Sequence, residues 1–211
     1  MAQDIPQITL GGGVGAAKAY GGTEVQKTNF AWFVEAGYYP VTKVEINAEE
    51  QIGIFSGSSL HPNGANPKSF INHYAATIFN VNVVPIVFFN DNQSELAHAL
   101  KNIYIGTGLG FLGSNVTNLN TGSIQVIDHT TNLLPMVPLK LEYEFSLINN
   151  RMEPVLKLDL ISTFYYTIGK GIDGYYDSFE KRGDFYNFLN ISIKYPLSLG
   201  GGPGKPYNKF D

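Results

Sequence analysis

Residues Pro138 to Ile148 read Pro-Leu-Lys-Leu-Glu-Tyr-Glu-Phe-Ser-Leu-Ile, and this stretch decides the fold. Its odd positions hold Leu139, Leu141, Tyr143, Phe145 and Leu147, and its even positions hold Lys140, Glu142, Glu144 and Ser146. A period of two predicts a β-strand with one apolar and one charged face. The same alternation recurs along the chain, and few residues remain to cover so many apolar faces. The economical solution is a closed barrel with lipid outside and polar side chains inside.

The composition narrows the remaining classes of protein. A length of 211 residues suits one domain, and charged residues, at 15%, are sparse for a soluble protein. No window of the sequence approaches the roughly 18 consecutive apolar residues of a transmembrane helix. A net charge of -4 offers no basic footprint for nucleic acid. Because cysteine is absent, the chain has neither a disulfide framework nor a thiolate metal site.

Seven further strands show the same alternation, at about residues 7–19, 29–39, 44–56, 70–87, 103–113, 155–167 and 185–197. The polar stretches 20–28 and 114–137 are predicted to be loops, with residues 124–128 as a candidate small hairpin arm in the second. Connections after the second and sixth strands are tight and those after odd-numbered strands are mostly long, as in outer-membrane barrels. We predict an all-β, eight-stranded antiparallel up-and-down transmembrane β-barrel over residues 1–199. A flexible tail is expected over residues 200–211, both termini on the periplasmic side, and a signal peptide already removed.

The charged faces of the predicted strands point into the lumen. Eight strands enclose an interior just wide enough for side chains to fill, and charges buried there must pair. We therefore predict a plugged lumen with a salt-bridge network; a narrow ion or proton path along the carboxylates is the alternative. The predicted network consists of Glu35, Glu45, Glu49, Lys140, Glu142, Glu144, Lys157, Asp159 and Lys194.

Glu50 does not fit the pattern of apolar outward residues, since strict alternation along its strand would place its carboxylate in the lipid-facing wall. Such a group costs on the order of 2 kcal/mol near the middle of a bilayer. A β-bulge at Glu49-Glu50 would turn the side chain inward. Alternatively, this face of the barrel contacts another membrane protein.

Catalysis on lipid A is an alternative function, because outer-membrane deacylases and acyltransferases exist on eight-stranded barrels. His61 and His129 fall in predicted external loops, and Asp128-His129 with Ser58 or Ser59 has the composition of a serine–histidine–acid site. Ordinary solvated loop residues explain the same pattern. No two histidines have metal-ligand spacing, so neither a metal site nor a cofactor is predicted.

The external loops are the other candidate for recognition, since loops on a rigid scaffold carry binding residues. Tyr175, Tyr176 and Phe179 lie among charged residues of the 168–184 loop, which include Asp173. Together they are predicted to form a tip that contacts a protein or glycan. An aromatic belt with solvated charges is the alternative explanation.

The whole chain resembles the small eight-stranded outer-membrane barrel proteins, of the outer membrane protein β-barrel domain type found in Bacteroidota. The resemblance rests on the Gly-rich segment Leu10–Gly15, on Glu35–Tyr39, on Gly106–Phe111 and on Leu189–Tyr195. These motifs describe architecture and carry little functional information. Such barrels usually finish at an aromatic residue of the last strand, whereas this chain continues to Phe210-Asp211. Either Tyr195 fills that role or the tail contacts a partner.

The sequence thus predicts a non-enzymatic integral protein of the bacterial outer membrane. Its partners are expected to be outer-membrane lipid and another outer-membrane or envelope protein, contacted by Glu50, Tyr175, Tyr176 and Phe179. The chain would then be a subunit of a larger envelope complex. The alternatives are a lipid A-modifying hydrolase or acyltransferase, and a soluble lipocalin-like ligand carrier with the opposite polarity of interior and exterior.

Overall fold

The computed structural model describes residues 7–21, 25–41, 43–58, 68–85, 100–120, 125–148, 154–169, 171–173 and 183–197. Its strands are β1 (Gln7–Tyr20), β2 (Val25–Lys27), β3 (Asn29–Val41), β4 (Val44–Ser58), β5 (Lys68–Val83), β6 (Ile103–Asn120), β7 (Gln125–Ile148), β8 (Pro154–Thr167) and β9 (Phe185–Leu197). No helix in this part of the chain is long and apolar enough to cross a membrane. The predicted tail 200–211 lies outside the described residues.

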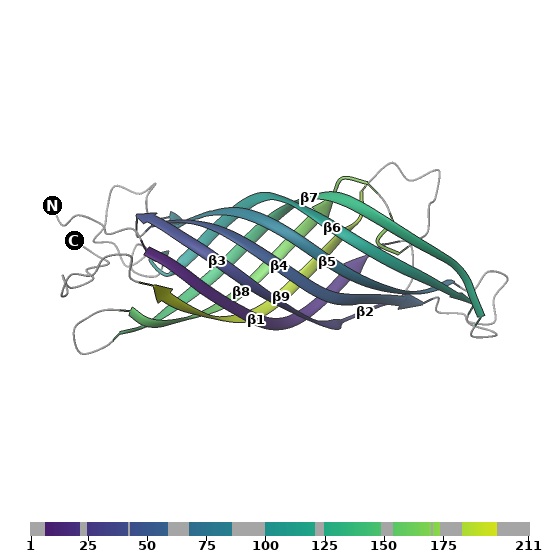
Figure 1. Ribbon diagram of the computed structural model, residues 1–211, viewed down its shortest axis with the longest axis horizontal. Coiled ribbons are helices and arrows are strands. Elements are labelled where there is room, and N and C mark those ends of the chain that lie inside the picture. The colour runs from purple at the N-terminus through teal and green to yellow at the C-terminus, as the bar shows by residue number, and fades with distance from the viewer. Residues whose placement is uncertain are drawn as a thin grey trace.

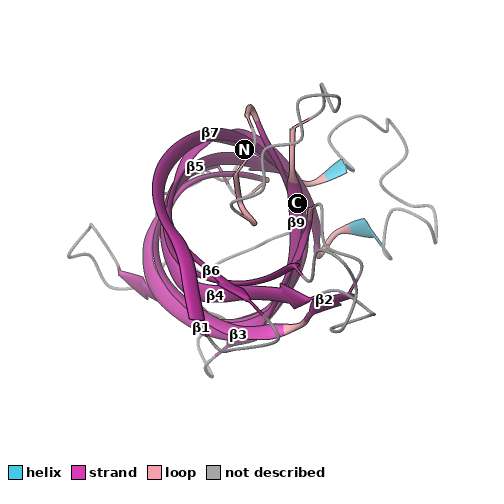
Figure 2. Cartoon of the chain, turned by 90° about the vertical axis from the view of Figure 1, so that its right-hand side faces the viewer, coloured by secondary structure: helices cyan, strands magenta, loops and turns pink. Residues whose placement is uncertain are grey.

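The strands form one closed antiparallel sheet. Each long strand pairs with its neighbours in the order β4-β3-β1-β9-β8-β7-β6-β5, and β4 also pairs with β5, which closes the ring. Figure 1 shows the strands tilted and wound about one axis, and Figure 2 shows the ring from its end. The predicted eight-stranded barrel is therefore confirmed, with β2 as a short additional piece that pairs with β4 beyond the start of β3. The predicted loop 20–28 was wrong over Val25–Lys27.

The two ends of the barrel differ. At one end, here called the turn end, β1 begins, β9 ends, and residues 42–43 join β3 directly to β4. At the other, the loop end, β6 and β7 pair with each other well beyond the end of β8, and β5 pairs with β6 as far as Asn120 (Figure 1). The predicted loop 114–137 was wrong: β6 continues to Asn120, and β7 starts at Gln125 and runs for 24 residues. The pairing of β7 with β6 passes over Val137 and Pro138, where the proline has no amide to donate, whereas Pro135 stays paired with Phe111.

The wall has the polarity of a membrane barrel. Large apolar side chains are exposed on its outer face on every long strand, among them Leu10, Phe30, Leu109, Leu141 and Ile191. Alternate residues of the same strands, including nearly all the charged ones, are buried inside. Because a soluble carrier would hide the apolar set and expose the charged one, the lipocalin-like alternative was wrong.

The lumen is divided along its length. In the half nearer the loop end, it is filled by aromatic and aliphatic side chains, with Tyr165 stacked on Tyr186 at 4.3 Å and Phe55 stacked on Tyr74 at 4.1 Å between ring centroids. In the half nearer the turn end, it is filled by charged and amide side chains. The predicted polar lining fills the half nearer the turn end, whereas the half nearer the loop end is mainly apolar, with polar inward side chains such as Asn72 among the rings.

Candidate functional site

Lys194 on β9 is the centre of the ionic half of the lumen. Its Nζ lies 2.9 Å from Glu142 Oε1, 3.0 Å from Glu45 Oε1, 3.2 Å from Asp159 Oδ2 and 3.7 Å from Glu35 Oε2. These carboxylates come from β7, β4, β8 and β3. One ammonium group therefore joins five strands of the barrel, and its side chain is fully buried.

Glycines on β1 leave the room that this arrangement needs. Gly11 pairs with Lys194 across the β1–β9 ladder, and a Cβ atom at Gly11 would lie 2.8 Å from Lys194 Cγ. The Lys194 stem therefore runs over a backbone without a side chain, which agrees with the interior face of close approach expected for this strand. The Gly-rich segment serves packing in the lumen.

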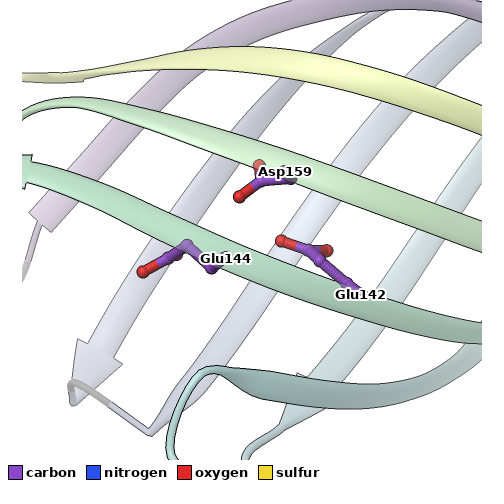
Figure 3. A group of neighbouring side chains, drawn as sticks. All are labelled: Glu142, Glu144 and Asp159. Atoms are coloured by element: carbon purple, nitrogen blue, oxygen red, sulfur yellow. The ribbon is translucent and has the colours of Figure 1, made fainter.

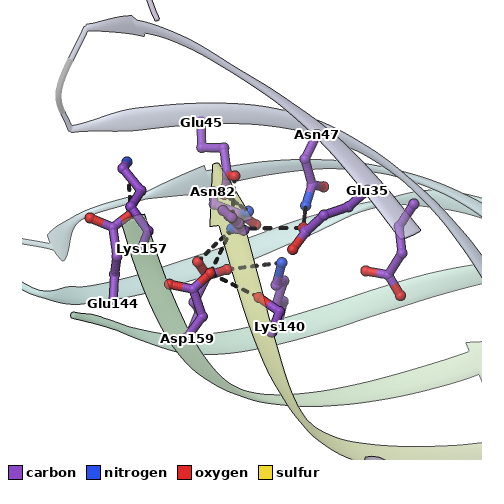
Figure 4. Close-up of polar contacts among 12 residues, drawn as sticks. Glu35, Glu45, Asn47, Asn82, Lys140, Glu144, Lys157 and Asp159 are labelled. Carbon is purple, nitrogen blue, oxygen red and sulfur yellow. Dashed lines mark hydrogen bonds and ion pairs between the residues drawn. The ribbon is translucent and has the colours of Figure 1, made fainter. Parts of the chain in front are cut away.

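The other two lysines of the network each form one ion pair with a carboxylate of β7. Lys157 Nζ lies 3.0 Å from Glu144 Oε2 and 3.7 Å from the centroid of the Tyr39 ring. Lys140 Nζ lies 2.9 Å from Glu142 Oε2, an ion pair without hydrogen-bond alignment. Figure 4 shows Lys157 with Glu144 beside the group that includes Lys140 and Asp159. Tyr39 Oη, at 2.9 Å from Glu45 Oε1 and 3.3 Å from Glu144 Oε2, joins the two groups.

Neutral side chains complete the network. Asn82 Nδ2 donates to Glu45 Oε2 at 2.6 Å, and Asn47 Nδ2 donates to Glu35 Oε2 at 3.0 Å. Tyr39 Oη donates to Glu45 Oε1 at 2.9 Å, and Tyr165 Oη lies 3.4 Å from Glu49 Oε1, at the boundary with the aromatic half. These amides and phenols were not among the residues predicted to form the network. Their inward position in the alternation was the available signal.

Three of the carboxylates lie close enough to resemble a metal site. Glu142, Glu144 and Asp159 each have an oxygen within 4.8 Å of the others' (Figure 3). Lys194 contacts Glu142 and Asp159, and Lys157 contacts Glu144. The chain thus supplies ammonium groups as the counter-charges of this cluster, and we assign no metal to it.

Residues 171–173, here called the plug, lie inside the lumen near the loop end, where Ile172 belongs to the buried cluster of the aromatic half. Gly171, Ile172 and Asp173 are all buried, and Asn72 Nδ2 on β5 donates to the Ile172 carbonyl at 2.7 Å. Asp184 Oδ2 accepts from the amides of Gly171 and Ile172 at 2.9 and 3.0 Å. The expectation that Asp173 belongs to an exposed contact tip was therefore wrong.

The structure places the predicted lumen residues inside the barrel and Glu50 on its outer face. All nine predicted lumen residues point inward and are buried. Glu50 is exposed on the outer face of β4, where the register with β3 and β5 is continuous from Ile46 to Gly53, so the predicted bulge at Glu49-Glu50 was wrong. Tyr175, Tyr176 and Phe179 lie outside the described residues.

The strand register keeps the described residues of the hypothetical serine–histidine–acid site apart. His129 on β7 pairs with Thr117 on β6, whereas Ser58 on β4 pairs with Ser69 on β5. The two residues lie three strands apart, which is roughly 14 Å along the wall. His61 and Ser59 lie outside the described residues.

The chain is similar to known proteins in its fold alone. No protein-family model matches the chain, and no curated protein matches it. Two crystal structures of Ail, the attachment invasion locus protein of Yersinia pestis, each cover 92% of this chain and 99% of their own, at TM-score 0.52 and 8% and 9% identity. One of them holds the heparin analogue sucrose octasulfate.

A solid-state NMR structure of the outer membrane protein AlkL in DMPC bilayers covers 97% of this chain and 96% of its own, at 12% identity and TM-score 0.47. At such identities, the likeness to Ail shows the fold alone. The chain has the eight-stranded barrel fold of bacterial outer-membrane proteins, and its apolar outer wall agrees with that location.

Proposed function

We propose that this protein is a closed, non-enzymatic barrel of the bacterial outer membrane, and that it acts as an interaction subunit of a larger envelope complex. The observation that carries the proposal is the filled lumen. The charged cluster around Lys194 occupies the half nearer the turn end, and the stacked aromatic residues and the plug occupy the other half.

A filled lumen leaves no room for solutes to pass through the interior of the barrel. What remains for recognition is the outer wall and the loop end. The likeness to the Ail structures supports the scaffold in this proposal, and membership in the Bacteroidota-type group of barrels stays a prediction. The tail 200–211 is proposed as an additional partner contact.

Two measurements test the proposal. Purification in mild detergent after chemical cross-linking in cells should recover the barrel with a second envelope protein at constant stoichiometry. Reconstitution in planar bilayers should give no steady unitary conductance. Recovery of only free monomer would contradict the interaction role, and reproducible ohmic channels would contradict the closed lumen.

The enzymatic alternative is tested in the same preparation. Incubation with labelled lipid A should leave the lipid unchanged. Turnover that disappears in the variant His129→Ala would replace the interaction role by a catalytic one.

A further inference from the structure

One ionisable side chain points away from the lumen at mid-height of the apolar wall. Glu50 pairs laterally with Val34 on β3 and with Thr77 on β5. The outer face of β4 is apolar on both sides of it, at Ile46 and at Ile54, and both are exposed. Glu50 therefore lies in the middle of the lipid-facing belt and not at a membrane surface.

No other described residue forms a hydrogen bond or an ion pair with Glu50. The described outward residues that continue its row of lateral pairs around the wall carry no charge; they are Val34, Gly12, Ile193 and Leu158 on one side, and Thr77, Phe111 and Pro135 on the other. Ionisable side chains within a bilayer are costly and are usually paired or functional. The carboxylate is therefore unfavourable for an isolated barrel in lipid, and a partner would remove that cost.

The surface around Glu50 permits close approach of another backbone. Its outer-face neighbours on β3, β4 and β5 include the small side chains Ala36, Ala48, Ala75 and Thr77. Larger exposed side chains, Trp32, Ile52 and Phe79, border them. We call this surface the Glu50 patch: small residues around a carboxylate, with an apolar rim. Small residues at interfaces within membranes let two backbones pack closely.

A second copy of the chain does not supply the missing charge. A two-fold axis along the membrane normal through this patch would set Glu50 against Glu50, and like charges repel. The described outward residues that carry a basic group in the long strands, Lys18 and His73, lie nearer the loop end, six residues along β1 from Gly12 and four along β5 from Thr77. Lipid headgroups bear their charges at the membrane surfaces and not at this depth.

We propose that the Glu50 patch binds a membrane-spanning segment of a different protein, and that this segment carries a Lys or Arg at mid-depth to pair with Glu50. This inference rests on the proposed interaction function and names the chemistry of the partner. The pair forms in lipid with little water, so removal of one member leaves the other charge unpaired in the interface.

The experiment uses two variants of this chain. One carries a photo-activatable amino acid at Ala36, in the patch, and the other carries it at Ile191, on the far wall. Cells are irradiated and the adducts are isolated in mild detergent. The expected result is an adduct from Ala36 and none from Ile191, with the linked peptide in a membrane-spanning segment that contains Lys or Arg. In the background of Glu50→Leu, which suits a lipid-facing position, the yield should fall about tenfold or more.

The matched controls separate charge from folding. Lys27→Leu changes one exposed charge at the loop end and should leave the adduct unchanged. Glu50→Lys should abolish the adduct, and changing the partner's basic residue to Glu should restore it. Heat-modifiable mobility on gels verifies that each variant is a folded barrel.

The outcomes distinguish the two proposals. An adduct peptide without a basic residue, an adduct with a second copy of this chain or with lipid alone, or a yield unaffected by Glu50→Leu would each overturn the role of Glu50. If a partner still co-purifies in those cases, the interaction function stands and uses another surface. If no partner is recovered from any variant, both proposals fall.

Discussion

Lys194 is the single residue on which the interior of the barrel depends most. It contacts four carboxylates from four other strands, and all of these groups are buried. Within the described part of the lumen network, six carboxyl groups face three ammonium groups, so the loss of one lysine cannot be absorbed by the others. A buried charge left without its partner is far more destabilising than a lost surface pair.

The substitution Lys194→Met tests this dependence. It should lower the free energy of unfolding by about 3–5 kcal/mol, since it keeps the volume but leaves four carboxylates without their common cation. Urea unfolding of the barrel in lipid vesicles measures the change. Lys27→Met, at an exposed position of β2, should stay within about 0.5 kcal/mol of the unmodified protein. Equal effects of the two substitutions would contradict the central role of Lys194.

At Glu50, on the outer wall, a substitution should have the opposite effect and raise the free energy of unfolding. In vesicles that contain only this chain, Glu50→Leu should stabilise the barrel by up to about 2 kcal/mol, because a carboxylate at mid-depth is replaced by a side chain that suits lipid. The same urea titration measures it. Thr77→Val, in the neighbouring strand at the same depth, removes a hydroxyl and should change stability less. A destabilised Glu50→Leu barrel would show that Glu50 has a stabilising contact within its own chain.

At the scale of elements, the plug and β9 are coupled through Asp184. Its Oδ2 accepts two backbone hydrogen bonds from the plug, and its own carbonyl accepts from the amide of Thr167 at 2.8 Å. Gly169 and Gly171 have φ values of 132° and 123°, which L side chains rarely adopt. The chain therefore turns inward here by means of two glycines and one carboxylate.

We expect Asp184→Ala to loosen the plug without opening the barrel wall. Losing an ionised acceptor of two amides costs about 1.5–3 kcal/mol locally, so exchange of the Ile172 amide should accelerate by about 10-fold to 100-fold. Amide exchange measured by NMR in micelles reports it. Ser162→Ala, which removes a hydroxyl that accepts from Asn187 on the wall, is the control. Unchanged exchange at Ile172 would mean that packing alone holds the plug.

For the whole molecule, the property that determines its location in a membrane is that the apolar face of each long strand lies on the outside of the barrel. Trp32, the one tryptophan of the chain, is 43% exposed on the outer wall of β3, and its neighbour Phe33 is 1% exposed and faces the lumen. One step along a strand thus separates lipid from the interior.

Fluorescence tests this orientation directly. Trp32 should be strongly quenched by lipids brominated along their acyl chains. The paired variant with Trp32→Phe and Phe33→Trp moves the indole by one residue and should lose most of that quenching. If both proteins are quenched equally, the outward assignment of the apolar face fails.

The sequence by itself determined the strands and their two faces, because alternation follows from the local geometry of an extended backbone. From Leu139 to Leu147 and from Phe185 to Leu197, pattern and structure coincide. The nine lumen charges were also identifiable, since each occupies an inward position of an alternating strand. The polar run 114–137 misled the prediction because β6 and β7 leave the apolar belt there, and polar outward residues such as Asn115 and Thr131 no longer exclude a strand.

Only the tertiary structure decided which charges meet. Lys194 and Glu45 are 149 residues apart, and their contact depends on how far each strand is staggered around the closed ring. Stagger is a property of the whole barrel and leaves no mark in the alternation of one strand. The aromatic half of the lumen, the inward course of residues 171–173 and the continuous register across Glu49-Glu50 were decided in the same way, by closure and register and not by local preference.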